Sequence, residues 1–414
     1  MIYSIYQSFW CNLTNKIYLN LFMSKNFNDV VITSALRTPI GAYKGSLKDL
    51  SADKLGSIVI REILRKTKIN KDEIDEVIMG QVLTAGGGQN PARQATINAG
   101  IDISKPAHII NQVCGSGLRA VISGYQSIRL GEAKNVISGG QENMSLAPHL
   151  IFYRDNKKIS EKDLIDTMIN DGLIDAFNNY HMGVTAENVA KKYNISRVEQ
   201  DDFAINSQKK TEDAIRANRF KEELVKINQL GINLDKDEHP RKGLTKSDLE
   251  KLKTVFLKDG TVTPGNSSGI NDGAAALLLT TLDEAKKKSI QPLVKIVSWA
   301  SVGVEPSLMG LGPIEAVRKA VKKAKWNLNN IDLFEINEAF AAQSIAVIRE
   351  LNIDNRKVNV NGGAIALGHP IGASGARILV TLIHEMIKQK KNKGCATLCV
   401  GGGMGIALCM RESK

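Results

Sequence analysis

Residues 108–119 read HIINQVCGSGLR, which is a short apolar run, a glycine-rich loop and the start of an amphipathic segment. The apolar run 108–110 predicts a strand, and the apolar spacing over 117–130 predicts a helix. Cys114 lies in the loop between them. A strand that leads through a glycine loop into a helix is typical of a βαβ unit, so this stretch favours an α/β fold.

The same order of elements returns near the C-terminus. GSGLR at 115–119 resembles ASGAR at 373–377, and IDEV at 74–77 resembles IDLF at 331–334. The two pairs have the same separation along the chain to within one residue, which indicates a duplicated α/β half. Strands are expected at 30–32, 77–79, 108–110, 135–138, 293–297, 333–336, 358–360 and 397–400, and helices at 52–65, 117–130, 313–325, 338–351 and 376–387.

The segment between the two halves is polar, helical in pattern and balanced in charge. It is expected to be an insertion that covers a site made by the two halves. The predicted organisation is therefore an N-terminal extension (1–27), an N-terminal half (28–145), an inserted domain (146–270) and a C-terminal half (271–414).

Composition excludes several classes of protein. The chain has 414 residues, 43% of them hydrophobic, and five cysteines at uneven spacing, which argues against disorder and against a secreted disulfide framework. No apolar run approaches the roughly 20 residues of a membrane-spanning helix. The net charge of +12 is scattered rather than gathered in a basic stripe, so we expect neither a membrane nor a nucleic-acid partner.

The first residues differ from the rest. No acidic residue precedes Asp29, and nothing in 1–22 follows the strand and helix pattern. We expect a cytoplasmic protein, with the mitochondrial matrix as the alternative if residues 1–22 are a transit peptide.

Cys114 and His369 are the two residues with the strongest chemical context. Each lies in a glycine-rich loop between a predicted strand and a predicted helix, and the duplication brings both loops to one crevice. Backbone amides and a helix N-terminus are expected to lower the pKa of Cys114 and to bind an oxyanion. His369 could deprotonate that thiol or hold a substrate carbonyl. Context alone leaves a buried structural cysteine and a surface histidine open as alternatives.

Two further segments complete the candidate site. Cys399 precedes GGGMG, and Cys395 lies on the same strand face about 13 Å away, too far for a disulfide or a shared zinc. A metal site is therefore not expected here. The glycines of 401–405 do not have the spacing of a dinucleotide-binding loop and no helix follows them, so a dinucleotide is not expected either. Asn337 either caps a helix or reaches the crevice with its amide, and the sequence pattern does not separate these roles.

Four segments together resemble the thiolase family: CGSG at 114–117, NEAFA at 337–341, GGAIALGHPIGASG at 362–375 and CVGGGMG at 399–405. The resemblance covers about residues 28–412. It implies an α/β thiolase fold, which is a duplicated five-layer αβαβα core with an inserted loop domain. It also implies reversible Claisen condensation of coenzyme A thioesters, here two acetyl-CoA to acetoacetyl-CoA and CoA, without a metal or organic cofactor.

The resemblance also assigns roles to residues. Cys114 becomes the nucleophile, His369 its base, Cys399 the second acid/base and Asn337 the residue that holds a water, while the backbone N–H groups of Cys114 and Gly401 become the oxyanion donors. Contacts to coenzyme A fall on His181, Met182, Arg241, Ser268, Ala339 and Phe340.

The segments 141–149 and 181–182 resemble the biosynthetic, acetoacetyl-forming branch more than the degradative 3-ketoacyl branch, which stays the alternative. A homotetramer, built as a dimer of dimers, is implied as well. A binding protein that uses its basic surface is the alternative from another class, and the presence of Cys114, His369 and Cys399 together argues against it.

Overall fold

The computed structural model describes residues 29–154, 159–229 and 231–413, so the predicted extension 1–27 lies outside the described residues. One mixed sheet runs through the molecule in the order β14-β15-β16-β13-β1-β12-β5-β3-β4, with β2 paired to β12. Its strands are β1 (Val30–Arg37), β2 (Gly41–Ala42), β3 (Glu76–Gly80), β4 (Ala107–Ile110), β5 (Asn135–Asn143), β12 (Asn271–Thr281), β13 (Val294–Gly303), β14 (Leu333–Ile336), β15 (Lys393–Val400) and β16 (Met404–Glu412).

Strand pairing repeats between the two halves of this sheet. In the first half β1 and β5 are both antiparallel to β12, and β3 lies parallel between β5 and β4. In the second half β13 and β15 are both antiparallel to β16, and β14 is parallel to β15. The halves are joined where Val31 and Ile32 pair with Lys295 and Val294. The sheet is therefore a duplicated α/β unit, as the sequence repeat predicts.

The repeated IDEV and IDLF segments occupy equivalent places. Asp75 accepts hydrogen bonds from the backbone of Lys134 and Asn135, directly before and at the start of β5. Asp332 accepts them from the backbone of Asn392 and Lys393, directly before and at the start of β15. The sequence match therefore marks one repeated device that fixes how two neighbouring parallel strands begin.

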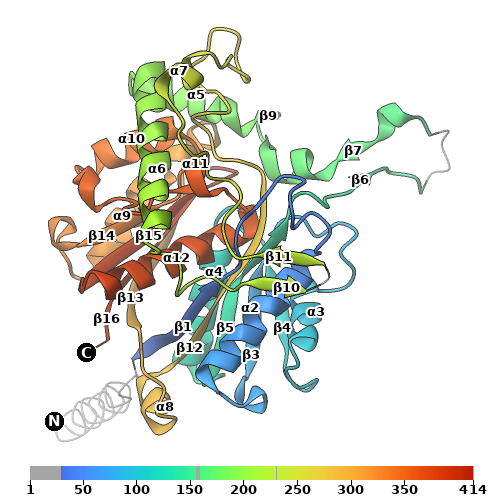
Figure 1. Cartoon of the computed structure of the whole chain (residues 1–414), viewed down its shortest axis with the longest axis vertical. Helices are drawn as coiled ribbons and strands as arrows, with labels where there is room; N and C mark the ends of the chain where they lie inside the picture. Colours follow the sequence, from blue (N-terminus) through green and yellow to red (C-terminus); the bar gives the residue numbers. More distant parts are fainter. Residues whose placement is uncertain (1–28, 155–158, 230, 414) are drawn as a thin grey trace, which may run out of the picture.

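Helices form three layers around the two half-sheets (Figure 1). The middle layer packs against both half-sheets, an outer layer covers the first half and another covers the second. The middle helices are α4 (Ser116–Leu130) and α12 (Ile371–Lys388), the first outer layer holds α2 (Ala52–Thr67) and α3 (Pro91–Asn98), and the second holds α9 (Gly312–Lys323) and α10 (Ala341–Glu350). This is the five-layer αβαβα arrangement that the family resemblance implies.

The middle helices approach closely because glycine lies at their crossing. A Cβ on Gly117 would come within 2.7 Å of the backbone nitrogen of Ala376, and one on Gly375 within 2.3 Å of that of Leu118. Real Cβ atoms are not found this near to backbone atoms, so the two glycines permit the crossing. It brings the N-terminal ends of both helices to one place.

The segment between β5 and β12 contains short strands and three helices. They are β6 (His149–Leu150), β7 (Ile165–Asp166), a π-helical turn (Met168–Leu173), β8 (Ile174–Asp175), β9 (Tyr180–His181), α5 (Met182–Lys192), α6 (Arg197–Arg216), β10 (Ile227–Gln229), β11 (Ile232–Leu234) and α7 (Lys246–Glu250). After β12 come α8 (Leu282–Lys287) and, before α12, α11 (Ala364–Leu367). β12 itself pairs with β1 and β5, so strand pairing groups it with the first half, whereas the predicted boundary at 271 groups it with the second.

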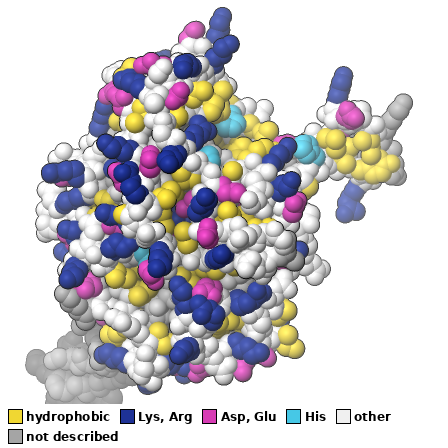
Figure 2. Space-filling model, in the orientation of Figure 1, with side chains coloured by type: hydrophobic (Ala, Val, Ile, Leu, Met, Phe, Trp, Pro, Cys, Tyr) yellow, Lys and Arg dark blue, Asp and Glu magenta, His cyan; other side chains and the backbone are white. Residues whose placement is uncertain are grey.

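One part of the insertion leaves the body of the molecule. The arm, residues 146–154 and 159–166, carries β6 and β7 and projects to one side (Figure 1). Hydrophobic side chains gather on it, and Lys and Arg are spread over the face shown in Figure 2 rather than gathered in a stripe. Its exposed apolar residues include Leu146, Phe152, Tyr153, Ile159 and Leu164. Within the described ranges, no helix has the length and apolar character needed to cross a membrane.

Candidate active site

Cys114 is presented by a strained turn between β4 and α4. Val113 has a φ of +45°, an unusual conformation for a β-branched residue. Ser116 Oγ fastens the turn by accepting from the backbone N–H of Gln112 at 2.9 Å and donating to the carbonyl of Val113 at 2.6 Å. The thiol is half-buried, and it lies at the N-terminal end of α4. The turn therefore aims Cys114 into the space between the halves.

His369 lies in the matching loop before α12 and is 6% exposed. Its Nδ1 is 2.5 Å from Ser374 Oγ, and that hydroxyl donates to the carbonyl of Pro370 at 2.9 Å. Because the hydroxyl hydrogen is used there, Ser374 accepts from Nδ1–H, and Nε2 keeps a lone pair. The amide Nδ2 of Asn337 lies 3.5 Å from Nε2. His369 is thus held as the tautomer that can accept a proton at Nε2.

Burial dominates the electrostatics of both groups. It raises the pKa of Cys114 to about 11, although the backbone N–H groups of Gly401 and of Cys114 act in the opposite direction. The expectation of a lowered thiol pKa is wrong for this structure, because desolvation outweighs the amides and Glu142 adds a negative charge nearby. Burial and the charge of Arg377 lower the pKa of His369 to about 3. At neutral pH the pair is therefore a thiol and a neutral imidazole.

Cys399 and Asn337 lie behind these two groups. Cys399, near the end of β15, is 1% exposed, and burial followed by the proximity of Cys114 raises the pKa of its thiol. Asn337 follows β14, and its backbone N–H donates to the carbonyl of Thr397 at 3.0 Å. Its Oδ1 is buried and has no hydrogen-bond partner among the described residues. Asn337 therefore presents its amide inward and does not cap α10, which begins at Ala341.

A cavity of about 500 Å³ joins the predicted catalytic and coenzyme A residues. Its wall includes Cys114, His369, Gly401, His181, Met182, Arg241, Ser268, Ala339 and Phe340. Cys399 and Asn337 stand outside that lining, next to Cys114 and His369 respectively. The structure thus brings every sequence-predicted site residue to one region.

Several lining residues were not predicted. Phe256 stacks on the His181 ring at 4.6 Å between centroids and meets the Phe340 ring edge-on at 6.3 Å. Leu173, from the π-helical turn, lines the wall near Cys114 together with Ile371. An isolated Phe in a lysine-rich loop carries no sequence signal, and Leu173 reaches the wall only through the fold of the insertion.

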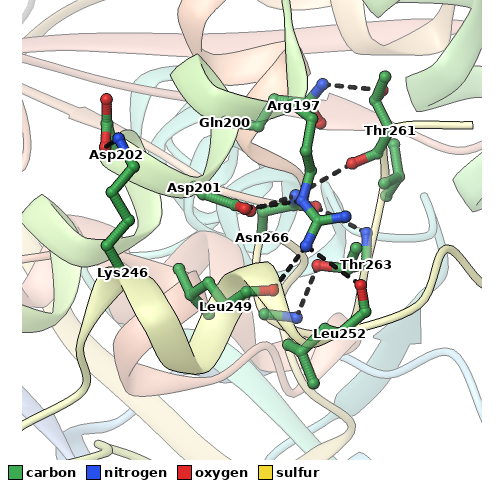
Figure 3. A network of polar contacts seen from close by, with 12 residues as sticks. Arg197, Gln200, Asp201, Asp202, Lys246, Leu249, Leu252, Thr261, Thr263 and Asn266 are labelled. Carbon is green, nitrogen blue, oxygen red and sulfur yellow. Dashed lines mark hydrogen bonds and ion pairs between the residues drawn. The ribbon is translucent and has the colours of Figure 1, made fainter.

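A polar network within the insertion ties α6 and α7 to the loop that precedes Ser268 (Figure 3). Arg197 on α6 donates to Asp201 at 2.6 Å and to the carbonyl of Leu249 at 2.6 Å. Asp201 in turn accepts from Asn266 Nδ2 at 2.9 Å. The next residues face the NEAFA segment, since the backbone N–H of Ser268 donates to the carbonyl of Ala339 at 3.0 Å. The network therefore positions the loop that supplies one side of the cavity.

No cluster of three or more possible metal ligands occurs in the part of the chain that the structure describes. The groups that converge at the cavity are two thiols, an imidazole, an amide and backbone N–H donors. This set can carry an acyl group on sulfur, move protons between sulfur, nitrogen and carbon, and stabilise an oxyanion.

Comparison with known proteins agrees with the geometry. The thiolase N-terminal domain family matches residues 30–283, and the thiolase C-terminal domain family matches 290–412. An acetyl-CoA acetyltransferase of Pseudomonas aeruginosa is 54% identical over 388 residues, covering 92% of this chain and 99% of the relative. The cytosolic acetyl-CoA acetyltransferase of Mus musculus is 51% identical over 396 residues, covering 94% and 100%.

A solved structure agrees as well. The human mitochondrial 3-ketoacyl-CoA thiolase in complex with CoA has a TM-score of 0.90 and 40% identity, covering 94% of this chain and 99% of that one. The repeated half-sheets, the paired loops of Cys114 and His369 and these matches over nearly the whole described chain have one explanation: the chain belongs to the thiolase family.

Proposed function

We propose that this protein is an acetyl-CoA C-acetyltransferase that condenses two acetyl-CoA to acetoacetyl-CoA and CoA, and catalyses the reverse. The observation that carries the proposal is that Cys114 and His369 line one cavity together with the expected coenzyme A residues, while Cys399 lies next to Cys114. The 54% and 51% identical relatives are named for this activity.

The first half-reaction transfers acetyl to the enzyme. His369 Nε2 takes the proton of Cys114 as the sulfur attacks the thioester carbonyl, and the oxyanion is bound by the N–H groups of Cys114 and Gly401. The bond between the carbonyl carbon and the coenzyme A sulfur then breaks, and His369 returns the proton to the departing thiolate. A neutral thiol and a neutral imidazole at rest suit this transfer, because the base starts unprotonated.

The second half-reaction forms the carbon–carbon bond. A second acetyl-CoA loses a methyl proton, its enolate attacks the acetyl group on Cys114, and the bond from that sulfur to the acetyl carbon breaks. Cys399 takes the methyl proton and gives its own thiol proton to the sulfur of Cys114 as that sulfur leaves, so the enzyme returns to its starting protonation state. Asn337 faces the enolate oxygen, either directly with the N–H groups of Nδ2 or through a water held by its free Oδ1.

This chemistry needs no metal or organic cofactor, and its partners are acetyl-CoA, acetoacetyl-CoA and CoA. Short acyl chains are proposed as substrates, and the support is that the curated relatives are named for acetyl transfer and that the apolar side chains of Leu173 and Ile371 pack beside Cys114 in the cavity wall. The degradative 3-ketoacyl-CoA thiolase remains the second candidate, favoured by the solved human structure but at lower identity.

A homotetramer is proposed as the assembly. The exposed apolar side chains of the arm support it, since a contiguous apolar surface of this kind needs a partner. The edge strand β4 is open for pairing as well. A cytoplasmic location is proposed from the relative named cytosolic, with the mitochondrial matrix as the alternative if residues 1–22 are a transit peptide.

Thiolysis kinetics with defined substrates test the proposal. Acetoacetyl-CoA is expected to be cleaved with a kcat/KM at least about tenfold above that of 3-ketodecanoyl-CoA, since a methylene that does not fit costs about 1 kcal/mol or more. Equal values for both would favour the degradative candidate, and no CoA-dependent cleavage of either would contradict the proposed function.

A further inference from the structure

Glu142 is a buried carboxylate beside the site that the reaction described above does not use. It lies near the end of β5 and is fully buried. Three backbone N–H groups donate to its oxygens: that of Val82 at 3.0 Å, that of Leu83 at 3.2 Å and that of Gly372 at 2.9 Å. These amides belong to two different segments, the loop after β3 and the first turn of α12, so a single side chain ties them together.

Both segments contribute to the environment of the nucleophile. Gly372 is three residues after His369. Its N–H lies in the first turn of α12, where backbone N–H groups have no acceptor within the helix, and it donates to Glu142 instead. Leu83 packs in the apolar cluster against which the Cys114 side chain lies. The backbones are crowded here, because a Cβ on Gly140 would come within 2.2 Å of the carbonyl oxygen of Gly372. The place of Gly372 therefore fixes the loop that carries His369.

The charge of Glu142 also acts on the nucleophile. Burial raises the pKa of Glu142 to about 7, so the carboxylate is ionised across the alkaline range in which Cys114, with a pKa of about 11, forms its thiolate. Its negative charge disfavours the thiolate. The other groups that face this region are Cys399 from β15, His369 before α12 and Asp272 from β12.

We propose that Glu142 is a positioning residue that holds the loop of His369 and the 82–83 loop in place relative to Cys114. This role rests on the proposed function, because it concerns turnover. The effect of the carboxylate charge on the Cys114 thiol is independent of any substrate, so it gives a second readout.

Glu142→Gln separates these effects. The glutamine has the same shape, but one carboxylate oxygen becomes an amide NH₂ that cannot accept from a backbone N–H, so at least one of the three amides loses its partner. We expect kcat for acetoacetyl-CoA thiolysis to fall about 10- to 100-fold with KM changed little, since a displaced reacting group costs this much. Loss of the charge is expected to lower the pH at which Cys114 is alkylated, because the carboxylate disfavours the thiolate.

The readout is the rate of iodoacetamide modification of the Cys114 peptide against pH, measured by mass spectrometry beside the turnover assay. Asp272→Asn is the matched control, because it also removes a buried carboxylate, one whose bonds go to Ser145 instead. It is expected to leave the alkylation profile in place. A slower enzyme whose thiol reacts at lower pH is the pattern expected of Glu142→Gln alone.

An unchanged kcat in folded Glu142→Gln would overturn the positioning role, and an unchanged alkylation profile would overturn the role of the charge. If that variant does not fold, Glu142→Asp keeps the charge but withdraws it from the amides, so a lower kcat with a wild-type alkylation profile is expected. A wild-type kcat in Glu142→Asp would contradict the positioning role. Failure of the proposed function would show as absent turnover in the wild-type enzyme, with the alkylation comparison still measurable.

Discussion

The two halves of the molecule share a frame and differ in the loops at the ends of α4 and α12. Gly117 and Gly375 serve the same purpose at the helix crossing, and Asp75 and Asp332 start equivalent strands. Both equivalent serines donate to a backbone carbonyl of their own turn, but Ser116 accepts from the backbone N–H of Gln112, whereas Ser374 accepts from the imidazole of His369. The two halves therefore have similar helix ends but different reactive side chains. Cys114 occurs only in the loop of the first half, and His369 only in the loop of the second.

The largest loss of activity is expected when His369, the proton acceptor supplied by the second half, is replaced. In His369→Gln the loop keeps a side chain of similar size, but the proton acceptor for Cys114 is lost. Acylation, followed as the burst of CoA released from acetyl-CoA, should slow by about 10³-fold, within the range of general-base catalysis. His384→Gln is the control, because His384 bonds the carbonyl of Ala35 away from the cavity. A burst of normal rate in His369→Gln would mean that the two loops do not work as a pair.

The state of the thiol gives a second test. Because burial raises the pKa of Cys114 to about 11, the thiolate fraction should rise about tenfold for each pH unit from 7 to 9. The rate of Cys114 alkylation by iodoacetamide in the free enzyme should follow it. A rate that stays level over this range would indicate an ion pair of thiolate and imidazolium at rest, which the lowered pKa of His369 speaks against.

The two serines offer a matched pair of variants. Ser374→Ala removes the acceptor for Nδ1–H of His369 and should reduce kcat by about tenfold, through a mispositioned imidazole or tautomer. Ser116→Ala removes hydrogen bonds within the turn and should lower the free energy of unfolding by about 1–2 kcal/mol. Steady-state kinetics and chemical denaturation of both variants measure this. Equal losses of kcat would erase the distinction drawn between the loops.

The smallest difference between the halves is expected in the stability losses at Gly117 and Gly375, the two glycines of the helix crossing. Gly117→Ala and Gly375→Ala both place a methyl group against backbone at the crossing of α4 and α12, so each should lose about 1–3 kcal/mol of stability. The two losses should be similar, because the crossing is shared. Urea denaturation followed by circular dichroism compares them, and a neutral effect at one glycine alone would show that the frame is not symmetric.

Much of the frame could be predicted from the sequence because its strands are short apolar runs between turn residues. The strand at 333–336 is correct to the residue, and the middle helices are right apart from their first turns. β12 was missed, because NDGAAALLLTT is buried on both faces and shows no alternation. The expected strand at 358–360 is only a single bridge from Val358 to Phe334.

Site residues that lie in sequence motifs could be predicted, whereas those that reach the site only through tertiary packing could not. The glycine loops identified Cys114 and His369, but the direction of the thiol pKa was wrong, because burial depends on the whole fold. Phe256, Leu173 and Glu142 reach the site through tertiary packing, which no local pattern reports.

Trapping of the acyl-enzyme tests most directly the claim that the first half supplies the nucleophile and the second half the acid and base groups. The wild-type enzyme and Cys399→Ala are mixed with radiolabelled acetyl-CoA, quenched in acid and mapped by peptide. We predict label on Cys114 in both proteins, no label in Cys114→Ala, and loss of acetoacetyl-CoA formation by about 10²- to 10⁴-fold in Cys399→Ala. Label on Cys399, or full condensation without it, would contradict the assignment.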